Sequence, residues 1–297
     1  MSSPETVGLI AGWGTFPIDV ARTLRAQGRR VVCLGIQEHA DPQFAELCDD
    51  FRWIGIARVG GMIRYFRKHG ATKAVMAGKI FKDRLLYHGW GWMSHIPDWR
   101  AVRDFYPFFL TNTRDRKDDS ILGAVVDCFA KDGIDFVPAT DLVPELLVQY
   151  GILVGKKPGR SQRLDIDFGW QLAKQMGDLD VGQTVVVKGR STIAVEAVEG
   201  TDRCIQRAGE ICPQGGFVVV KVAKPQQDMR FDVPTIGLGT IQQLIEAKAA
   251  LLAIEAEKTI VLDQEKVVAH ARRHGLQIVA VRDGQVDALD DETSAAA

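Results

Sequence analysis

The first half of the chain alternates between short apolar runs and amphipathic segments, and this alternation restricts the fold more than any other feature. Runs of five to seven apolar residues suit buried strands, and the segments between them repeat their apolar residues with a helical period. Strands joined through helices favour a parallel sheet that helices cover on both faces. The expected strands are residues 7–11, 30–36, 73–77 and 134–137, and the expected helices are residues 17–27, 60–69 and 120–131.

The second half has a different rhythm. Residues 151–162 are rich in glycine and lysine, so we expect a linker between a domain at 1–150 and a second domain at 163–290. Gly189-Arg190-Ser191 separates two strand-like runs, which is typical of a hairpin. We expect a mixed α/β domain of unspecified topology, followed by a disordered tail at 291–297. The expected strands are 183–188, 192–198, 217–222, 259–262 and 277–281, and the expected helices are 165–176, one after Thr201-Asp202, 240–257 and 264–273.

Composition excludes several classes of protein. The net charge is -1 without a basic block, which argues against nucleic acid as a partner. No apolar run reaches the roughly 20 residues that span a bilayer, and the N-terminus lacks the basic region of a signal peptide. The five cysteines are scattered and odd in number, as in a reduced cytoplasmic protein. The six histidines show no metal-binding spacing, so we expect no histidine zinc site.

A glycine turn follows the first expected strand. Gly12, Gly14 and Thr15 stand where a parallel sheet presents backbone amides to a phosphate. The dinucleotide fingerprint has a third glycine where this chain has Pro17, so the turn suits a nucleotide better than NAD. The alternative is a turn that only connects strand and helix. Gly78 and Lys79, at the end of the third expected strand, are candidates for the same wall.

Two polar strings in the second half are candidate sites. The first contains Lys188, Glu196, Thr201 and Asp202, where a strand gives way to a helix. Helix capping by Thr201 or Asp202 would explain part of it without a ligand.

The second string, residues 221–237, alternates cations and carboxylates through a proline-bounded loop. Phosphoryl chemistry uses this mixture, because cations neutralise phosphate oxygens and a carboxylate holds a divalent metal or orients water. A solvated loop of surface ion pairs is the alternative. The candidates are Lys221, Lys224, Arg230, Asp232 and Thr235.

Asp118 and Asp119 form a third polar cluster, at the start of an expected helix. Acidic residues are favoured there by the helix dipole alone, and they could equally bind a metal or a sugar hydroxyl.

Taken together, these strings resemble the LpxI-type UDP-2,3-diacylglucosamine diphosphatases. The similar strings are GLIAGWGTFP, VMAGKI, the Asp118-Asp119 pair, LDVGQTVVVKG, AVEAVEGTD and KVAKPQQDMRFDVPTIG. They occur in order across nearly the whole chain, and the last two are the most specific.

The resemblance implies a Rossmann-like N-terminal domain and a distinct C-terminal α/β domain, in a cytoplasmic enzyme that is usually a homodimer. A further expectation is peripheral contact with the inner face of the inner membrane. It implies water attack on the α-phosphorus of UDP-2,3-diacylglucosamine, with magnesium required. The products are UMP and 2,3-diacylglucosamine 1-phosphate, an acylated lipid of the lipid A pathway. The essential aspartate of the family falls at Asp232, as metal ligand or as the group that positions water.

The chain departs from the family pattern in two places. Lys117 precedes the aspartate pair where members usually have glycine, and residues 84–110 are longer and more aromatic than expected. The aromatic segment suits either acyl chains or a domain or dimer interface. Two other functions remain open: a non-catalytic protein that binds nucleotide sugars or lipids, and an NAD(P)-dependent oxidoreductase with Glu38 at the ribose, against which Pro17 argues.

Overall fold

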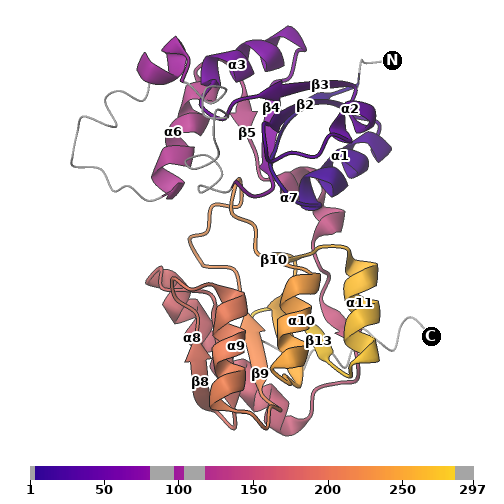
Figure 1. The fold of residues 1–297 in the computed structure, drawn as a ribbon, viewed down its shortest axis with the longest axis vertical. Coiled ribbons are helices and arrows are strands. Elements are labelled where there is room, and N and C mark those ends of the chain that lie inside the picture. The colour runs from indigo at the N-terminus through magenta and orange to yellow at the C-terminus, as the bar shows by residue number, and fades with distance from the viewer. Residues whose placement is uncertain (1–3, 81–96, 104–117, 285–297) are drawn as a thin grey trace. The chain divides into compact units, whose positions relative to one another are not determined.

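The computed structural model describes residues 4–80, 97–103 and 118–284, which form two compact units (Figure 1). One unit is Met1–Pro144 with Asp228–Phe231, and the other is Glu145–Gln227 with Asp232–Ala297. Each unit is an α/β domain with its own sheet, so the predicted fold class is confirmed. The first unit ends at Pro144 where the sequence predicted residue 150, and it includes a short return of the chain at Asp228–Phe231.

The N-terminal unit contains a fully parallel sheet in the order β3-β2-β1-β4-β5. The chain builds outward from β1 to β3 and then crosses to β4, so β1 and β4 flank the point where the strand order reverses. Open α/β sheets bind ligands beyond the carboxyl ends of such strands. The strands are β1 Thr6–Ala11, β2 Arg30–Ile36, β3 Asp50–Ile54, β4 Lys73–Ala77 and β5 Asp135–Phe136.

Helices cover both faces of this sheet (Figure 1). Helix α1 (Phe16–Ala26) packs on one face, and α3 (Val59–Lys68) and α6 (Asp118–Ala130) pack on the other. The α3–α6 face is apolar because β2 directs Val32, Leu34 and Ile36 to it, where they meet Phe66 and Phe129. Two short helices, α2 (Phe44–Leu47) and α7 (Ala139–Leu142), complete the unit.

The C-terminal unit contains a six-stranded mixed sheet in the order β6-β13-β11-β9-β7-β8. Strands β9, β11 and β13 are parallel, whereas β6, β7 and β8 are each antiparallel to a neighbour. The carboxyl ends of β8, β9, β11 and β13 therefore lie at one edge, together with the start of β7. The strands are β6 Gly151–Val154, β7 Thr184–Lys188, β8 Ser191–Val195, β9 Val218–Lys221, β11 Leu251–Glu255 and β13 Gln277–Val281.

One long helix and three shorter ones enclose this sheet. Helix α8 (Arg160–Asp178) buries Ile166, Trp170 and Ala173 against one face. Helices α9 (Thr201–Ile211), α10 (Leu238–Glu246) and α11 (Gln264–Arg273) pack on the other face. A separate two-stranded parallel ladder joins β10 (Thr235–Ile236) to β12 (Ile260–Val261). Among the described residues, no helix combines the length and the apolarity that a membrane span needs.

Two predictions about this unit are wrong. The helix expected at 240–257 ends at Glu246, and Leu251–Glu255 is instead a central, fully buried strand. Its two leucines and its alanine favour helices, but pairing with β9 and β13 overrides that preference. The linker expected at 151–162 is also absent, because Gly151–Val154 pairs with β13 and α8 begins at Arg160.

Candidate functional site

Polar side chains gather around the buried ammonium group of Lys221, at the edge of the C-terminal sheet where β9 and β11 end. This edge is called the polar edge below. Lys221, the last residue of β9, is only 6% exposed. Its Nζ donates to the Oγ1 of Thr201 at 3.0 Å and to the backbone oxygen of Thr235 at 3.3 Å. A buried cation is stable only when oxygens replace its hydration shell, so this lysine fixes the position of both partners.

Thr201 links Lys221 to a buried carboxylate, that of Glu196. Its hydroxyl donates to Glu196 Oε1 at 3.0 Å while it accepts from Lys221, and Thr184 Oγ1 lies 3.3 Å away. Glu196 is 7% exposed and also accepts the Gln183 amide at 3.4 Å. Gly200, not Thr201, is the N-cap of α9, so this hydroxyl serves the lysine–glutamate relay and does not cap the helix.

Glu255, at the end of the neighbouring strand β11, supports the loop that follows β9. Its buried carboxylate accepts from Lys174 Nζ at 2.6 Å and from the Ala223 amide at 2.8 Å, and it forms an ion pair with Lys258 Nζ at 3.0 Å. The sequence analysis missed this residue because it placed residue 255 in a helix. The signal that could have found it is an acidic residue at the end of an apolar run, the position that Lys221 has in its own run.

The loop after β9 leads to the exposed carboxylate of Asp232. Gln227 organises this loop: its Oε1 accepts the Lys224 amide at 2.9 Å, and its Nε2 donates to Asp232 Oδ2 at 2.6 Å. Lys224 extends its ammonium to Asp180 Oδ1 at 2.7 Å. One oxygen of Asp232 is thus anchored, and the other has no hydrogen bond to the described residues.

Arg230 lies in the short segment that belongs to the N-terminal unit. Its Nε and Nη2 donate to the carboxylate of Asp228 at 2.9 and 2.5 Å, and these bonds lower the pKa of Asp228. The guanidinium lies over the ring of Phe231, which packs against the α3–α6 core. The structure therefore shows Arg230 in an ion pair within the loop, as the alternative interpretation of residues 221–237 expected.

The glycine turn and the end of β4 pack directly on each other in the N-terminal unit. The amides of Trp13 and Lys79 each donate to the other residue's backbone oxygen at 2.9 Å. A Cβ on Gly12 would lie 2.8 Å from the Lys79 oxygen, and one on Gly78 would lie 2.8 Å from the Gly12 carbonyl carbon. Backbone packing therefore accounts for both glycines.

Gly14 and Thr15 are differently placed. Gly14 has a φ of +114° with open space beside it, and Thr15 is the N-cap of α1 without a side-chain capping bond. Lys79 is exposed beside them. These three residues lie at the carboxyl ends of β1 and β4, where the strand order reverses.

The remaining predicted site residues lie elsewhere. Lys188 is at the opposite end of β7 from Thr184, where its Nζ donates to the Gly215 oxygen at 2.6 Å. Asp202 is exposed and accepts from Thr240 Oγ1 at 2.8 Å, which ties α9 to α10. Asp118 and Asp119 begin α6, and their side chains lie outside the described part of the structure. The aromatic segment 84–110 also lies outside it, apart from residues 97–103.

The comparisons with known proteins cover nearly the whole chain. The model of the LpxI N-terminal domain matches residues 6–146, and that of the LpxI C-terminal domain matches residues 149–279. The UDP-2,3-diacylglucosamine pyrophosphatase LpxI of Caulobacter vibrioides is 30% identical over 282 residues, which are 93% of this chain and 97% of that protein. The chain belongs to the LpxI family.

A solved structure adds nothing to this assignment. The biotin carboxylase complex with β-γ-ATP from Campylobacter jejuni is 11% identical, with a TM-score of 0.28 over 71% of this chain. The chain spans 43% of that structure's length, and a likeness at this level carries no argument.

The most specific LpxI-type strings fall on the polar edge described above. AVEAVEGTD runs from the end of β8 through Glu196 to the start of α9, and KVAKPQQDMRFDVPTIG runs from Lys221 through Asp232 to β10. Four predicted residues therefore meet in one hydrogen-bonded cluster, Glu196, Thr201, Lys221 and Thr235.

Thiol chemistry does not fit this edge. Cys204 lies in the first turns of α9, and burial raises its pKa to about 12, with smaller contributions from nearby charges. Because the neutral thiol persists at pH 7, Cys204 is no nucleophile. Among the side chains that the structure describes, no three histidine, cysteine or acidic groups gather as a metal site.

The packing of the two N-terminal loops predicts that Gly12→Ala destabilises the protein by about 1–3 kcal/mol, the usual range for overpacking. The added methyl would meet the Lys79 backbone oxygen, which cannot rotate away. Urea unfolding measures the loss. Gly123→Ala in α6 is the control, since no described atom lies within 4 Å of its new methyl, and an equal loss in both variants would contradict the assigned contact.

The relay predicts that Thr201→Val lowers the free energy of unfolding by about 1–3 kcal/mol, as expected when buried polar groups lose a partner. Valine keeps the shape but leaves Lys221 and Glu196 without the bridging hydroxyl. Thr201→Ser retains the hydroxyl and should unfold close to the unaltered protein. If serine and valine cost the same, the hydroxyl does not bridge these groups.

Proposed function

We propose that this chain hydrolyses the diphosphate bond of UDP-2,3-diacylglucosamine to UMP and 2,3-diacylglucosamine 1-phosphate, a step of lipid A biosynthesis. The Caulobacter relative is named for this pyrophosphatase activity, and it is matched over 97% of its length. Membership of the LpxI family supports a hydrolase over a non-catalytic binding protein or an NAD(P)-dependent oxidoreductase.

The observation that carries the proposal is the half-anchored carboxylate of Asp232. Its Oδ2 is held by Gln227, while the side chain is exposed and Oδ1 faces no described donor. A carboxylate held by one oxygen is pre-oriented, so its free oxygen can position an attacking water or a metal at little entropic cost. Hydrolysis then places the oxygen of water on the α-phosphorus, and the sugar 1-phosphate leaves.

The basic residues of the loop have two different roles in this proposal. Lys221 is buried and hydrogen-bonded, so it holds the start of the loop in place. Lys224 and Arg230 already hold Asp180 and Asp228, so each would exchange a carboxylate for phosphate oxygens when substrate binds. Gly14, Thr15 and Lys79 remain candidates for the nucleotide phosphates.

Magnesium fits this arrangement as part of the proposal. Mg²⁺ is usually held by one or two carboxylates together with substrate phosphates and water, so a single exposed Asp232 is a sufficient protein ligand. When bound, the ion would neutralise charge on the diphosphate. Asp118 and Asp119 remain further candidates.

The same proposal includes a cytoplasmic homodimer that contacts the membrane peripherally. A substrate with two acyl chains partitions into lipid, so an enzyme that acts on it gains from a surface that meets the bilayer.

The reaction is tested by incubating the purified protein with UDP-2,3-diacylglucosamine and magnesium in oxygen-18 water, with a chelator in a parallel sample. We expect UMP and the acylated sugar phosphate, with the label on UMP and no product after chelation. Mass spectrometry resolves the products. Intact substrate with folded protein would favour the binding-protein alternative, and label on the sugar phosphate would move the attack to the β-phosphorus.

Asp232→Asn should lower turnover by at least about a hundredfold while substrate binding changes little, because the lost contact acts mainly in the transition state. Single-turnover rates and a separate binding measurement check the two effects. Asp263→Asn is the matched control: Asp263 has a φ of 48°, which asparagine tolerates, and its side chain bonds only to Lys266 among the described residues. Near-normal turnover in Asp232→Asn would remove Asp232 from the site.

A further inference from the structure

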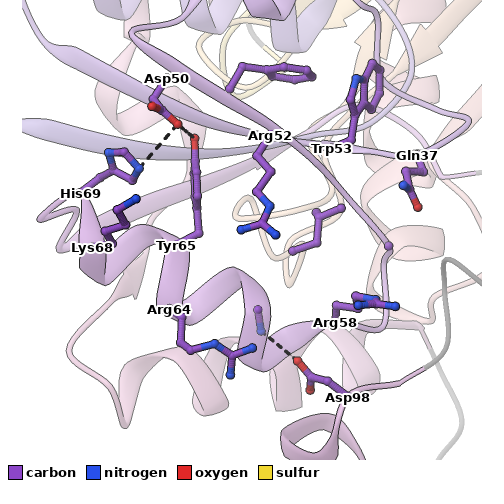
Figure 2. Close-up of a pocket in the computed structure, with 14 residues that line it drawn as sticks. Gln37, Asp50, Arg52, Trp53, Arg58, Arg64, Tyr65, Lys68, His69 and Asp98 are labelled. Atoms are coloured by element: carbon purple, nitrogen blue, oxygen red, sulfur yellow. Dashed lines mark hydrogen bonds and ion pairs between the residues drawn. The ribbon is translucent and has the colours of Figure 1, made fainter.

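A second polar concavity lies in the N-terminal unit, away from the carboxyl ends of β1 and β4. It is an open groove of about 720 Å³ between the edge strand β3 and helix α3. Figure 2 shows Arg52 reaching from β3 toward α3, and Arg64 on the helix opposite. Arg58 and Lys68 also line the groove, so four cationic side chains border it.

These cations have no ionic partner in the part of the chain that the structure describes. Arg52, Arg58, Arg64 and Lys68 are all exposed, and none of their side chains forms an ion pair or hydrogen bond with the described residues. The two acids of the groove do have partners. Asp50 accepts from Tyr65 Oη at 2.7 Å and lies 3.5 Å from His69, and Asp98 accepts the Gly61 and Ala101 amides at 2.8 and 2.9 Å. Among the described residues the groove therefore presents four cations against two carboxylates, an excess of positive charge.

Two tryptophans, one in the lining of this groove and one next to a lining residue in sequence, are exposed. Trp53 is 39% exposed on β3, where its ring packs edge-on against Phe51. Trp99 is 79% exposed and directly follows Asp98, whose carboxylate lines the groove. Tryptophan beside arginine and lysine is typical of a protein surface at the boundary between lipid and water, where the ring enters the headgroup layer.

The spacing of the cations favours a membrane over a single small anion. Arg64 and Lys68 are four residues apart on one side of α3, and Arg58 precedes the helix, so the charges span about 15 Å of a ten-residue helix. One phosphate cannot contact all of them, whereas neighbouring lipid headgroups can. Arg52 also argues against strand pairing with a second copy, because a charged residue on an edge strand discourages it.

We propose that the β3–α3 groove is a docking surface for anionic phospholipid headgroups, with Arg52, Arg58, Arg64 and Lys68 facing the phosphates and Trp99 entering the interface. The inference deepens the peripheral membrane contact of the proposed function and rests on it, but it does not depend on the reaction. Docking at this surface would bring the enzyme to the bilayer in which a diacylated substrate resides.

Sedimentation with vesicles tests the docking surface. The full chain should bind vesicles that contain phosphatidylglycerol and bind neutral phosphatidylcholine vesicles weakly, with affinity for the anionic vesicles falling as salt rises. The double variant Arg52→Gln/Arg64→Gln should bind anionic vesicles about 25-fold more weakly, at roughly fivefold for each cation removed. Trp99→Ser should weaken binding at every salt concentration, because its contribution is apolar.

Arg272→Gln/Arg273→Gln on α11 is the control, since it removes the same charge from exposed positions of the other unit. It should retain vesicle binding. Equal losses in both double variants would mean that the net charge of the protein, and not the groove, determines vesicle binding, and this would overturn the proposal. No binding by the unaltered protein would overturn it too. Two further results would also overturn it: groove-dependent binding of inorganic phosphate or UMP with vesicle binding unchanged, or a change of oligomeric state in the groove variant.

Hydrolysis of detergent-dispersed substrate separates this inference from the proposed reaction. The groove variant should hydrolyse dispersed substrate at the rate of the unaltered protein and lose activity only on substrate held in anionic vesicles. Loss of both activities would assign the groove to the substrate site instead. A protein that binds vesicles through the groove but releases no UMP would refute the reaction and leave the docking surface standing.

Discussion

The buried ammonium of Lys221 is the interaction on which the polar edge of the C-terminal unit depends. A charge removed from water must be surrounded by oxygens, and here they come from Thr201 and Thr235, residues on either side of Lys221 in sequence. Because Thr201 also bonds Glu196, one lysine ties the end of β8, the start of α9 and the start of β10 to the end of β9. The loop that carries Asp232 thus begins and ends at fixed points, Lys221 and Thr235.

Strand direction explains why residues so distant in sequence meet there. Parallel β9 and β11 end at the same edge, which places Glu255 beside the segment after Lys221, where it holds the Ala223 amide. The same rule places the end of β1 beside the end of β4 in the other unit, where the glycine turn packs on residues 78 and 79. In the C-terminal unit the sheet interior is apolar and provides stability, while Lys221 and Glu255 stand at the last positions of β9 and β11.

The sequence predicted these elements where one strong signal dominated. Buried strands such as Arg30–Ile36 and Lys73–Ala77 have the predicted bounds because they are uninterrupted apolar runs between turns. The edge strand Asp50–Ile54 was missed because half of it faces solvent and carries charge, and Leu251–Glu255 was mistaken for helix because only its neighbours make it a strand. Glu196, Thr201 and Lys221 were found as polar residues at the ends of apolar runs. The supporting Glu255 depends on tertiary contacts that spacing does not reveal.

The position of Asp232 follows from a short excursion of the chain, in which four residues leave the C-terminal unit before the chain returns to it. The segment Asp228–Phe231 belongs to the N-terminal unit, where Phe231 packs in the α3–α6 core and Asp228 fixes Arg230. Gln227 is the last residue before this excursion and Asp232 the first after it, and their side chains bond to each other at 2.6 Å. That bond closes the excursion as a small loop, so the order of Asp232 derives from contacts that flank it and not from its own burial. A carboxylate ordered in this way is fixed in position and stays exposed to solvent. Either role proposed for Asp232, metal ligand or positioner of water, would need this combination, and the bond from Gln227 would leave the other oxygen as the acting atom in both.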